Sequence, residues 1–75
     1  MPEAYEFIFM DSEEEIPKIK EMLRGVERAK GSVFSFDKEK GKIIFLVSIP
    51  TEVHKRFYLE SKKAGYKIKH LGFIL

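Results

Sequence analysis

The stretch Lys42-Ile43-Ile44-Phe45-Leu46-Val47-Ser48-Ile49 decides the fold of this 75-residue chain. It is almost continuously apolar, and most of its residues are β-branched or aromatic. Such a run is typical of a strand that is covered on both faces, whereas a strand with one face in water alternates apolar and polar residues. We therefore expect residues 42–49 to form a central strand of a β-sheet.

The chain before this stretch has the pattern of one strand followed by one helix. Residues 4–10 are apolar except for Glu6, and they stop at Asp11-Ser12, which are favourable helix N-caps. Residues 16–29 place their apolar side chains on one helical face, and Gly31 follows as a helix terminator. The sequence thus predicts a first strand and then an amphipathic helix that begins between residues 11 and 16.

The rest of the chain continues this alternation. Residues 32–37 alternate polar and apolar side chains, and a charged loop of about four residues containing Gly41 joins them to the central run as a hairpin. Thr51 is a candidate N-cap for a second helix, which Gly65 would end. Residues 66–75 have the pattern of a last strand.

The predicted order of elements, βαββαβ, resembles the split-βαβ arrangement of ferredoxin-like domains. In that arrangement two helices cover one face of a four-stranded antiparallel sheet with strand order 4-1-3-2, so the first and third strands are central. The two most apolar predicted strands, 4–10 and 42–49, are the first and the third. We therefore expect one two-layer α+β domain over residues 1–75.

The composition is that of a folded domain with a thin core. A chain of this length buries only about 60% of the surface that it exposes when unfolded. Because it has no cysteine, no disulfide can compensate for the small core. Association with a second chain is another common way to stabilise so small a domain, so we expect it here. The chain has no Asn or Gln, and Lys and Glu supply most of its charge, a bias typical of hyperthermophile proteins. Its longest apolar run is too short to span a membrane, so we expect a cytoplasmic protein.

The sheet face that the helices leave open is the candidate interaction site. Side chains alternate across a strand, so we place the polar residues Glu6 and Ser48 on this open face. With this choice, six apolar residues are expected beneath the helices: Phe7, Phe9, Phe34, Phe36, Phe45 and Val47. The apolar residues left on the open face and in the C-terminal strand are Ile8, Met10, Val33, Ile44, Leu46, Leu71, Phe73 and Leu75. An exposed apolar patch with a polar rim often marks a protein contact, so we expect a non-catalytic module that forms a homodimer, or binds a small protein partner, through these residues.

The charge distribution keeps RNA or another polyanion as an alternative partner. Residues 1–37 have a net charge of −4, whereas residues 38–75 have +6. The basic residues of the second half are Lys38, Lys40, Lys42, Lys55, Arg56, Lys62, Lys63, Lys67 and Lys69. The element order is also that of the RNA-recognition motif, but Lys40-Gly41 is followed by Lys42-Ile43-Ile44, so both aromatic positions of that motif are missing.

Candidate catalytic and metal-binding residues are sparse. His54 and His70 are the two histidines, and no second ligand pair accompanies them at a recognisable spacing. The acidic run Glu13-Glu14-Glu15 is accounted for by a helix start, where the helix dipole favours acids. We therefore expect no enzyme, metal site or cofactor. A regulatory small-ligand domain, with its site at a dimer interface, is a further alternative by analogy of fold.

Overall fold

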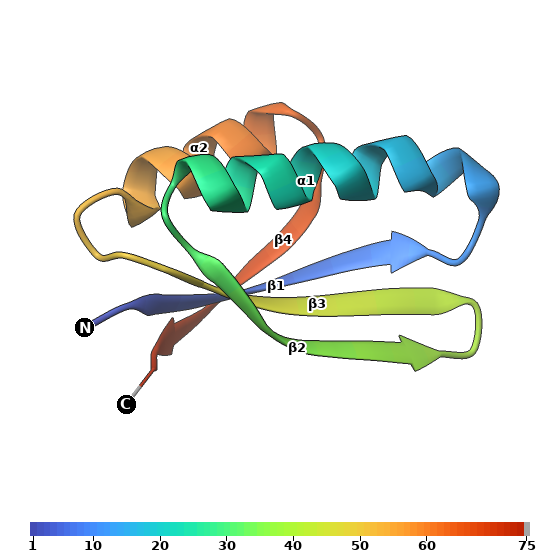
Figure 1. Ribbon diagram of the computed structural model, residues 1–75, viewed down its shortest axis with the longest axis horizontal. Coiled ribbons are helices and arrows are strands. Elements are labelled where there is room, and N and C mark those ends of the chain that lie inside the picture. Colours follow the sequence, from blue (N-terminus) through green and yellow to red (C-terminus); the bar gives the residue numbers. More distant parts are fainter. Residues whose placement is uncertain (75) are drawn as a thin grey trace.

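The structure is a computed structural model that describes residues 1–74. Strands and helices alternate as the sequence predicts (Figure 1). In chain order they are β1 (Glu3–Met10), the 3-10 helix η1 (Glu13–Glu15), α1 (Ile16–Arg28), β2 (Ser32–Glu39), β3 (Lys42–Ile49), α2 (His54–Lys63) and β4 (Lys67–Phe73). The central strand has the bounds that we expected, and the loop before it is shorter than expected, because β2 extends to Glu39 and only Lys40 and Gly41 connect the hairpin.

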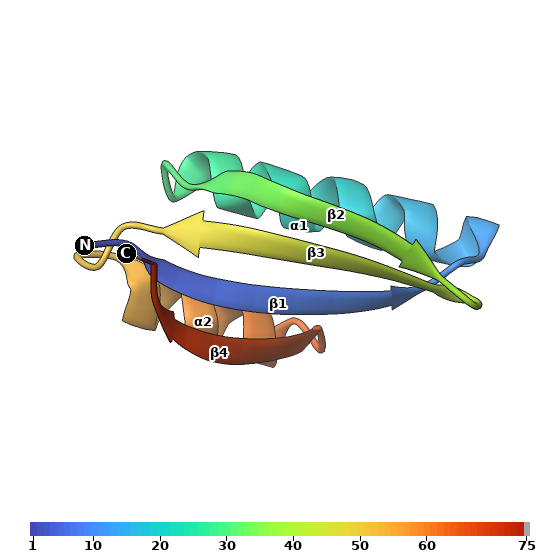
Figure 2. The same cartoon turned by 90° about the horizontal axis from the view of Figure 1, so that it is seen from below.

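The four strands form one antiparallel sheet with the order β2-β3-β1-β4. This is the predicted 4-1-3-2 order with β1 and β3 in the centre, and the α+β prediction is confirmed. Both helices lie on the same face, with α1 towards β2 and α2 towards β4 (Figure 1 and Figure 2). We call this the covered face. The opposite face, which is turned to the viewer in Figure 2, is the open face.

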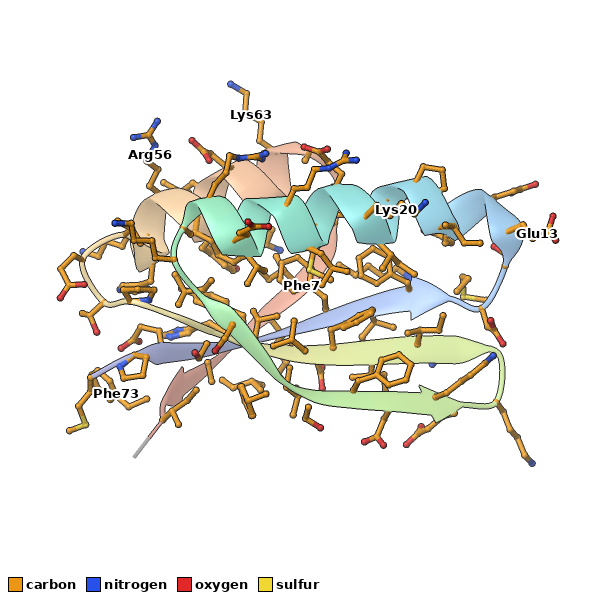
Figure 3. The ribbon with its side chains drawn as sticks, viewed as in Figure 1. Phe7, Glu13, Lys20, Arg56, Lys63 and Phe73 are labelled. Atoms are coloured by element: carbon orange, nitrogen blue, oxygen red, sulfur yellow. The ribbon has the colours of Figure 1, made fainter. Side chains whose placement is uncertain are left out.

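The hydrophobic core lies between the covered face and the helices. Figure 3 shows Phe7 pointing from β1 towards the helices, and its side chain is fully buried. The buried core residues are Tyr5, Phe7, Phe9, Met22, Val26, Phe45, Val47, Ile49, Phe57 and Ile68. Phe7, Phe9, Phe45 and Val47 thus lie beneath the helices as predicted, because alternation along β1 and β3 sends every second side chain to the same face.

Strand β2 contains a β-bulge that the alternation pattern does not predict. Val33 pairs with Val47 and Ser35 pairs with Leu46, so Phe34 is an additional residue in the ladder. Directly opposite residues of an antiparallel pair share a face. Since Val47 is buried in the core, Val33 lies on the covered side and not on the open face where the alternation pattern places it.

The two aromatic residues of β2 are also less covered than the sequence predicts. Phe36 pairs with Phe45, and their ring centroids lie 5.3 Å apart, yet Phe36 is 57% exposed. Phe34, at the bulge, is 50% exposed. Because β2 is an edge strand, with a neighbouring strand on one side alone, these rings have fewer neighbours than the rings of β1 and β3.

Lys30 and Gly31 have different roles at the end of α1 from those that the sequence predicts. Lys30 adopts the left-handed conformation, with a φ of 58°, that we expected of Gly31. Gly31 is instead packed so closely that a Cβ atom there would collide with the carbonyl oxygen of Ser48 and the side chain of Ile49. Glycine is therefore required here by the close approach of the α1–β2 connection to the end of β3.

The segments near both ends of the described chain are held by hydrogen bonds. The Ile74 N–H donates to the Pro2 carbonyl at 3.0 Å. The predicted cap of α2 is wrong, since the helix begins at His54 without a side-chain cap and the Thr51 hydroxyl donates to the Met1 carbonyl instead. The start of β1 is thus tied both to β4 and to the loop before α2.

Candidate functional site

The open face carries a strip of aliphatic side chains along its two central strands. Ile8 of β1 pairs with Ile44 of β3, and Leu46 lies two residues further along β3. These three residues are half-buried, and Met10 at the end of β1 is 53% exposed. We call Ile8, Met10, Ile44 and Leu46 the aliphatic strip; they are four of the residues that the sequence places on this face.

The two edges of the open face carry opposite charges. On β4, Lys67 and Lys69 pair with open-face residues of β1, and on β2, Asp37 pairs with an open-face residue of β3. Lys67, Asp37 and the paired residues Ile8 and Ile44 between them form one row across the sheet. Within residues 1–74, neither Lys67 nor Asp37 forms a salt bridge. The strip therefore runs between a basic edge and an acidic edge.

The C-terminal residues of the predicted interface lie apart from the aliphatic strip. Leu71, at a β-bulge in β4, is 44% exposed. Phe73 pairs with Glu3, at the opposite end of β1 from Ile8, and is 66% exposed (Figure 3). Leu75 lies outside the described residues. The strip and these residues are thus two separate apolar areas.

The predicted basic residues do not lie on one surface. They divide into Lys38 and Lys40 at the β2–β3 hairpin, Lys55, Arg56, Lys62 and Lys63 on α2, and Lys42, Lys67 and Lys69 on the open face. Lys42 pairs with Met10 and lines one hollow with Lys67. Figure 3 shows Arg56 and Lys63 projecting from α2 away from the sheet, on the side opposite to the open face. Binding of a polyanion stays a prediction.

A buried carboxylate and both histidines of the chain meet on the covered face. Glu3 begins β1, His54 begins α2, and His70 lies on β4 opposite Tyr5 of β1. One potential ligand atom from each of Glu3, His54 and His70 lies within 4.8 Å of the other two. Oε1 of Glu3 is 2.8 Å from Nε2 of His70. Glu3 is 4% exposed, whereas His54 is half-buried and the His70 side chain is 42% exposed.

The second oxygen of Glu3 is buried without a partner. Among the described residues, no group donates a hydrogen bond to Oε2 of Glu3. Most buried polar atoms of folded proteins have a hydrogen-bond partner, because a buried charge without one is costly. The cluster therefore has an unused acceptor next to two imidazoles, and its three side chains are of the kinds that bind cations or exchange protons.

Tyr5 connects this cluster to the core. Its hydroxyl lies 2.7 Å from Nδ1 of His54, and its ring stacks on that of His70 with a centroid distance of 4.9 Å. Burial raises the pKa of the Tyr5 phenol, and the nearby carboxylate of Glu3 raises it further. The hydroxyl therefore stays protonated at neutral pH, and it shares a hydrogen bond with Nδ1 of His54.

Sequence reasoning did not find this cluster, because its members are far apart in the chain. The two histidines are 16 residues apart, and Glu3 precedes His54 by 51 residues, so no motif spacing links them. The one available signal is topological. In the predicted strand order the last strand lies beside the first, which brings His70 close to the start of the chain.

A groove of about 390 Å³ separates the two helices. Its base includes Met22 and Phe57, and its rims carry charged side chains. These charges are engaged with one another, since Arg28 pairs with Glu21 at 3.4 Å within α1. On the other rim, Arg56 pairs with Glu60 at 3.0 Å within α2.

Comparison with known families finds no family model that matches the chain, and no curated protein matches its sequence. Within residues 1–74, no helix is long and apolar enough to cross a membrane. The open face and the cluster of Glu3, His54 and His70, which we call the Glu3 cluster, are therefore the two candidate sites.

Proposed function

We propose that this protein is a small, non-catalytic interaction module of the ferredoxin-like type, and that it forms a homodimer through the open face of its sheet. The observation that carries the proposal is the aliphatic strip between a basic and an acidic edge. Such a face is self-complementary, because one copy can present its basic edge to the acidic edge of another. The strand order β2-β3-β1-β4 with both helices on one face supports the ferredoxin-like assignment.

A two-fold axis parallel to the strands satisfies this complementarity. Rotation about such an axis, placed between two facing sheets, exchanges β2 with β4 and β3 with β1. Ile8 of one copy then faces Ile44 of the other, and Lys67 faces Asp37, because these four residues lie in one row. The twist of each sheet turns the two sets of strands by about 30° without changing which edges meet.

The size of the open face fits a dimer of modest affinity. Four strands about 4.8 Å apart, with residues about 3.3 Å apart along each, give a face on the order of 500 Å². Side chains add to this flat area, so two such faces bury about 1,000–1,200 Å² in total, near the lower end of specific interfaces. We therefore expect a dissociation constant in the micromolar range, or about −8 kcal/mol.

Glu6 and Lys42 are charged residues of the two central strands on the open face, and their burial would oppose dimer formation. Glu6 lies beside Leu46, so dimer formation would remove its carboxylate from part of its water. Lys69 is its cross-strand neighbour on β4, and the proximity of this cation reduces the cost.

Substitution of Ile44 by lysine tests the proposal. In a symmetric dimer the change buries two additional charges at the centre of the interface, at a cost of about 2 kcal/mol or more for each. The dissociation constant measured by sedimentation equilibrium should therefore rise at least about 100-fold. Circular dichroism should show the secondary structure unchanged, since Ile44 lies outside the buried core.

Leu59→Lys is the matched control. Leu59 lies on α2 and is 66% exposed, so the same change of chemistry there should leave the dissociation constant unchanged. A wild-type protein that is monomeric at high micromolar concentration would overturn the proposal, as would a dimer that Ile44→Lys does not weaken.

A further inference from the structure

We propose that Glu3, His54 and His70 form a binding site for one divalent cation of the zinc type. The site lies on the covered face, where β1, β4 and the start of α2 meet. It does not depend on the proposed dimer, because the open face is on the other side of the sheet.

The three side chains are a suitable set of donors for such an ion. Zinc in proteins is commonly held by imidazole nitrogen and carboxylate oxygen, and two histidines with one carboxylate leave a fourth position for water or a ligand. Imidazole also binds copper, nickel and iron, whereas magnesium and calcium prefer oxygen ligands alone. The cluster therefore favours a transition metal over the alkaline earth ions.

The buried oxygen of Glu3 is an independent indication of a ligand. Glu3 is 96% buried, and its Oε2 has no hydrogen-bond partner among residues 1–74. A carboxylate in this position is costly to the fold unless something supplies positive charge or a hydrogen bond to both oxygens. Oε1 lies 2.8 Å from Nε2 of His70. On binding, this nitrogen would coordinate the ion in place of that contact, and the ion would compensate the charge of the carboxylate.

The cluster can reach metal-binding geometry by a small movement. Ligand atoms about 2.0–2.1 Å from a tetrahedral zinc ion lie about 3.4 Å from one another. The present atoms are within 4.8 Å, so the largest separation must shrink by up to about 1.4 Å. The 2.8 Å between Oε1 of Glu3 and Nε2 of His70 must in turn lengthen if both atoms bind the ion. The His70 side chain is 42% exposed and has room to rotate, and its exposure also gives the ion a path from solvent.

Tyr5 is placed to hold His54 in position. A metal-binding histidine usually makes a hydrogen bond through its second ring nitrogen, which fixes the orientation of the ring. The Tyr5 hydroxyl lies 2.7 Å from Nδ1 of His54, so with the ion on Nε2 the Nδ1–H group would donate to the Tyr5 oxygen. The Tyr5 ring also packs against both imidazoles. Tyr5 is therefore a positioning residue of the proposed site.

Titration of the full chain with Zn²⁺ by isothermal titration calorimetry tests the proposal. The protein should carry no histidine tag, because a tag binds the same ions. We expect one equivalent of Zn²⁺ for each chain, no comparable binding of Mg²⁺, and visible absorption from Co²⁺ typical of four or five ligands. Line broadening by Co²⁺ in NMR spectra of the wild type should be strongest at the rings of His54 and His70.

Three variants and one control determine which residues bind the ion. His54→Gln, His70→Gln and Glu3→Gln should each weaken Zn²⁺ binding at least about tenfold, since loss of supporting contacts alone costs that much. Glu6→Gln removes a carboxylate from the same strand on the other face and should leave the affinity unchanged. If Glu3→Gln impairs folding, the Co²⁺ line broadening measured on the wild-type protein locates the ion instead of that variant. Absence of stoichiometric Zn²⁺ binding, or binding that Glu3→Gln leaves unchanged in a folded protein, would overturn the proposed site.

Discussion

At the scale of single residues, Gly25 and Gly31 lie close together in the chain, within and just after α1, but they have different surroundings. Gly25 lies inside α1, and a Cβ atom there would meet nothing nearer than Nη2 of Arg28 at 3.9 Å. Gly31 has no such space, because a Cβ atom would collide with Ser48 and Ile49. A substitution at Gly25 therefore tests helix propensity, whereas one at Gly31 tests close packing.

Alanine at these two positions should have opposite effects. Gly25→Ala should raise the free energy of unfolding by about 0.5–1 kcal/mol, because alanine favours the helix. Gly31→Ala should lower it by about 1–3 kcal/mol, because the close contact must be relieved by backbone movement. Urea denaturation at one fixed protein concentration measures both values. A Gly31→Ala protein as stable as the wild type would contradict the close contact of Gly31 with Ser48 and Ile49.

At the scale of elements, the central strands β1 and β3 followed the sequence pattern and the edge strand β2 did not. β1 and β3 keep strict alternation, so the buried set Phe7, Phe45 and Val47 could be predicted from polar positions alone. In β2 the bulge at Phe34 reverses the alternation, and no local signal such as glycine marks it. A bulge depends on pairing with the neighbouring strand, and a pattern within one strand does not contain that information.

The edges of the sheet also give a test of the proposed arrangement of the dimer. If Lys67 of one copy faces Asp37 of the other, then Lys67→Glu and Asp37→Lys should each weaken the dimer by about threefold to tenfold, and the double variant should restore it. The expected change in the dissociation constant follows from the two Lys67–Asp37 pairs of the symmetric dimer, because an exposed ion pair is worth about 0.2–1 kcal/mol. Sedimentation equilibrium at low salt measures the three dissociation constants.

Lys63→Glu is the control for net charge, since Lys63 projects from α2 away from the sheet (Figure 3). It should leave the dissociation constant close to that of the wild type. A double variant no tighter than the single variants would contradict the pairing of these two edges, even if the protein is a dimer.

At the scale of the whole molecule, the hydrophobic pattern was enough to predict the strand order but not to predict the Glu3 cluster. Strand order follows from which segments are most apolar and from the short connections between them. The cluster follows from exact side-chain positions where β1, α2 and β4 meet, which patterning does not specify. The open face and the cluster lie on opposite sides of the sheet, so the two proposals concern chemically distinct surfaces and can be tested separately.

The most direct test of the central claim is an isotope-filtered NMR measurement on a dimer mixed from labelled and unlabelled chains. The proposed arrangement predicts intermolecular contacts between the methyl groups of Ile8 in one copy and Ile44 in the other. Contacts confined to the exposed aromatic residues of β2, Phe34 and Phe36, would indicate pairing through the sheet edge and would contradict dimer formation through the open face.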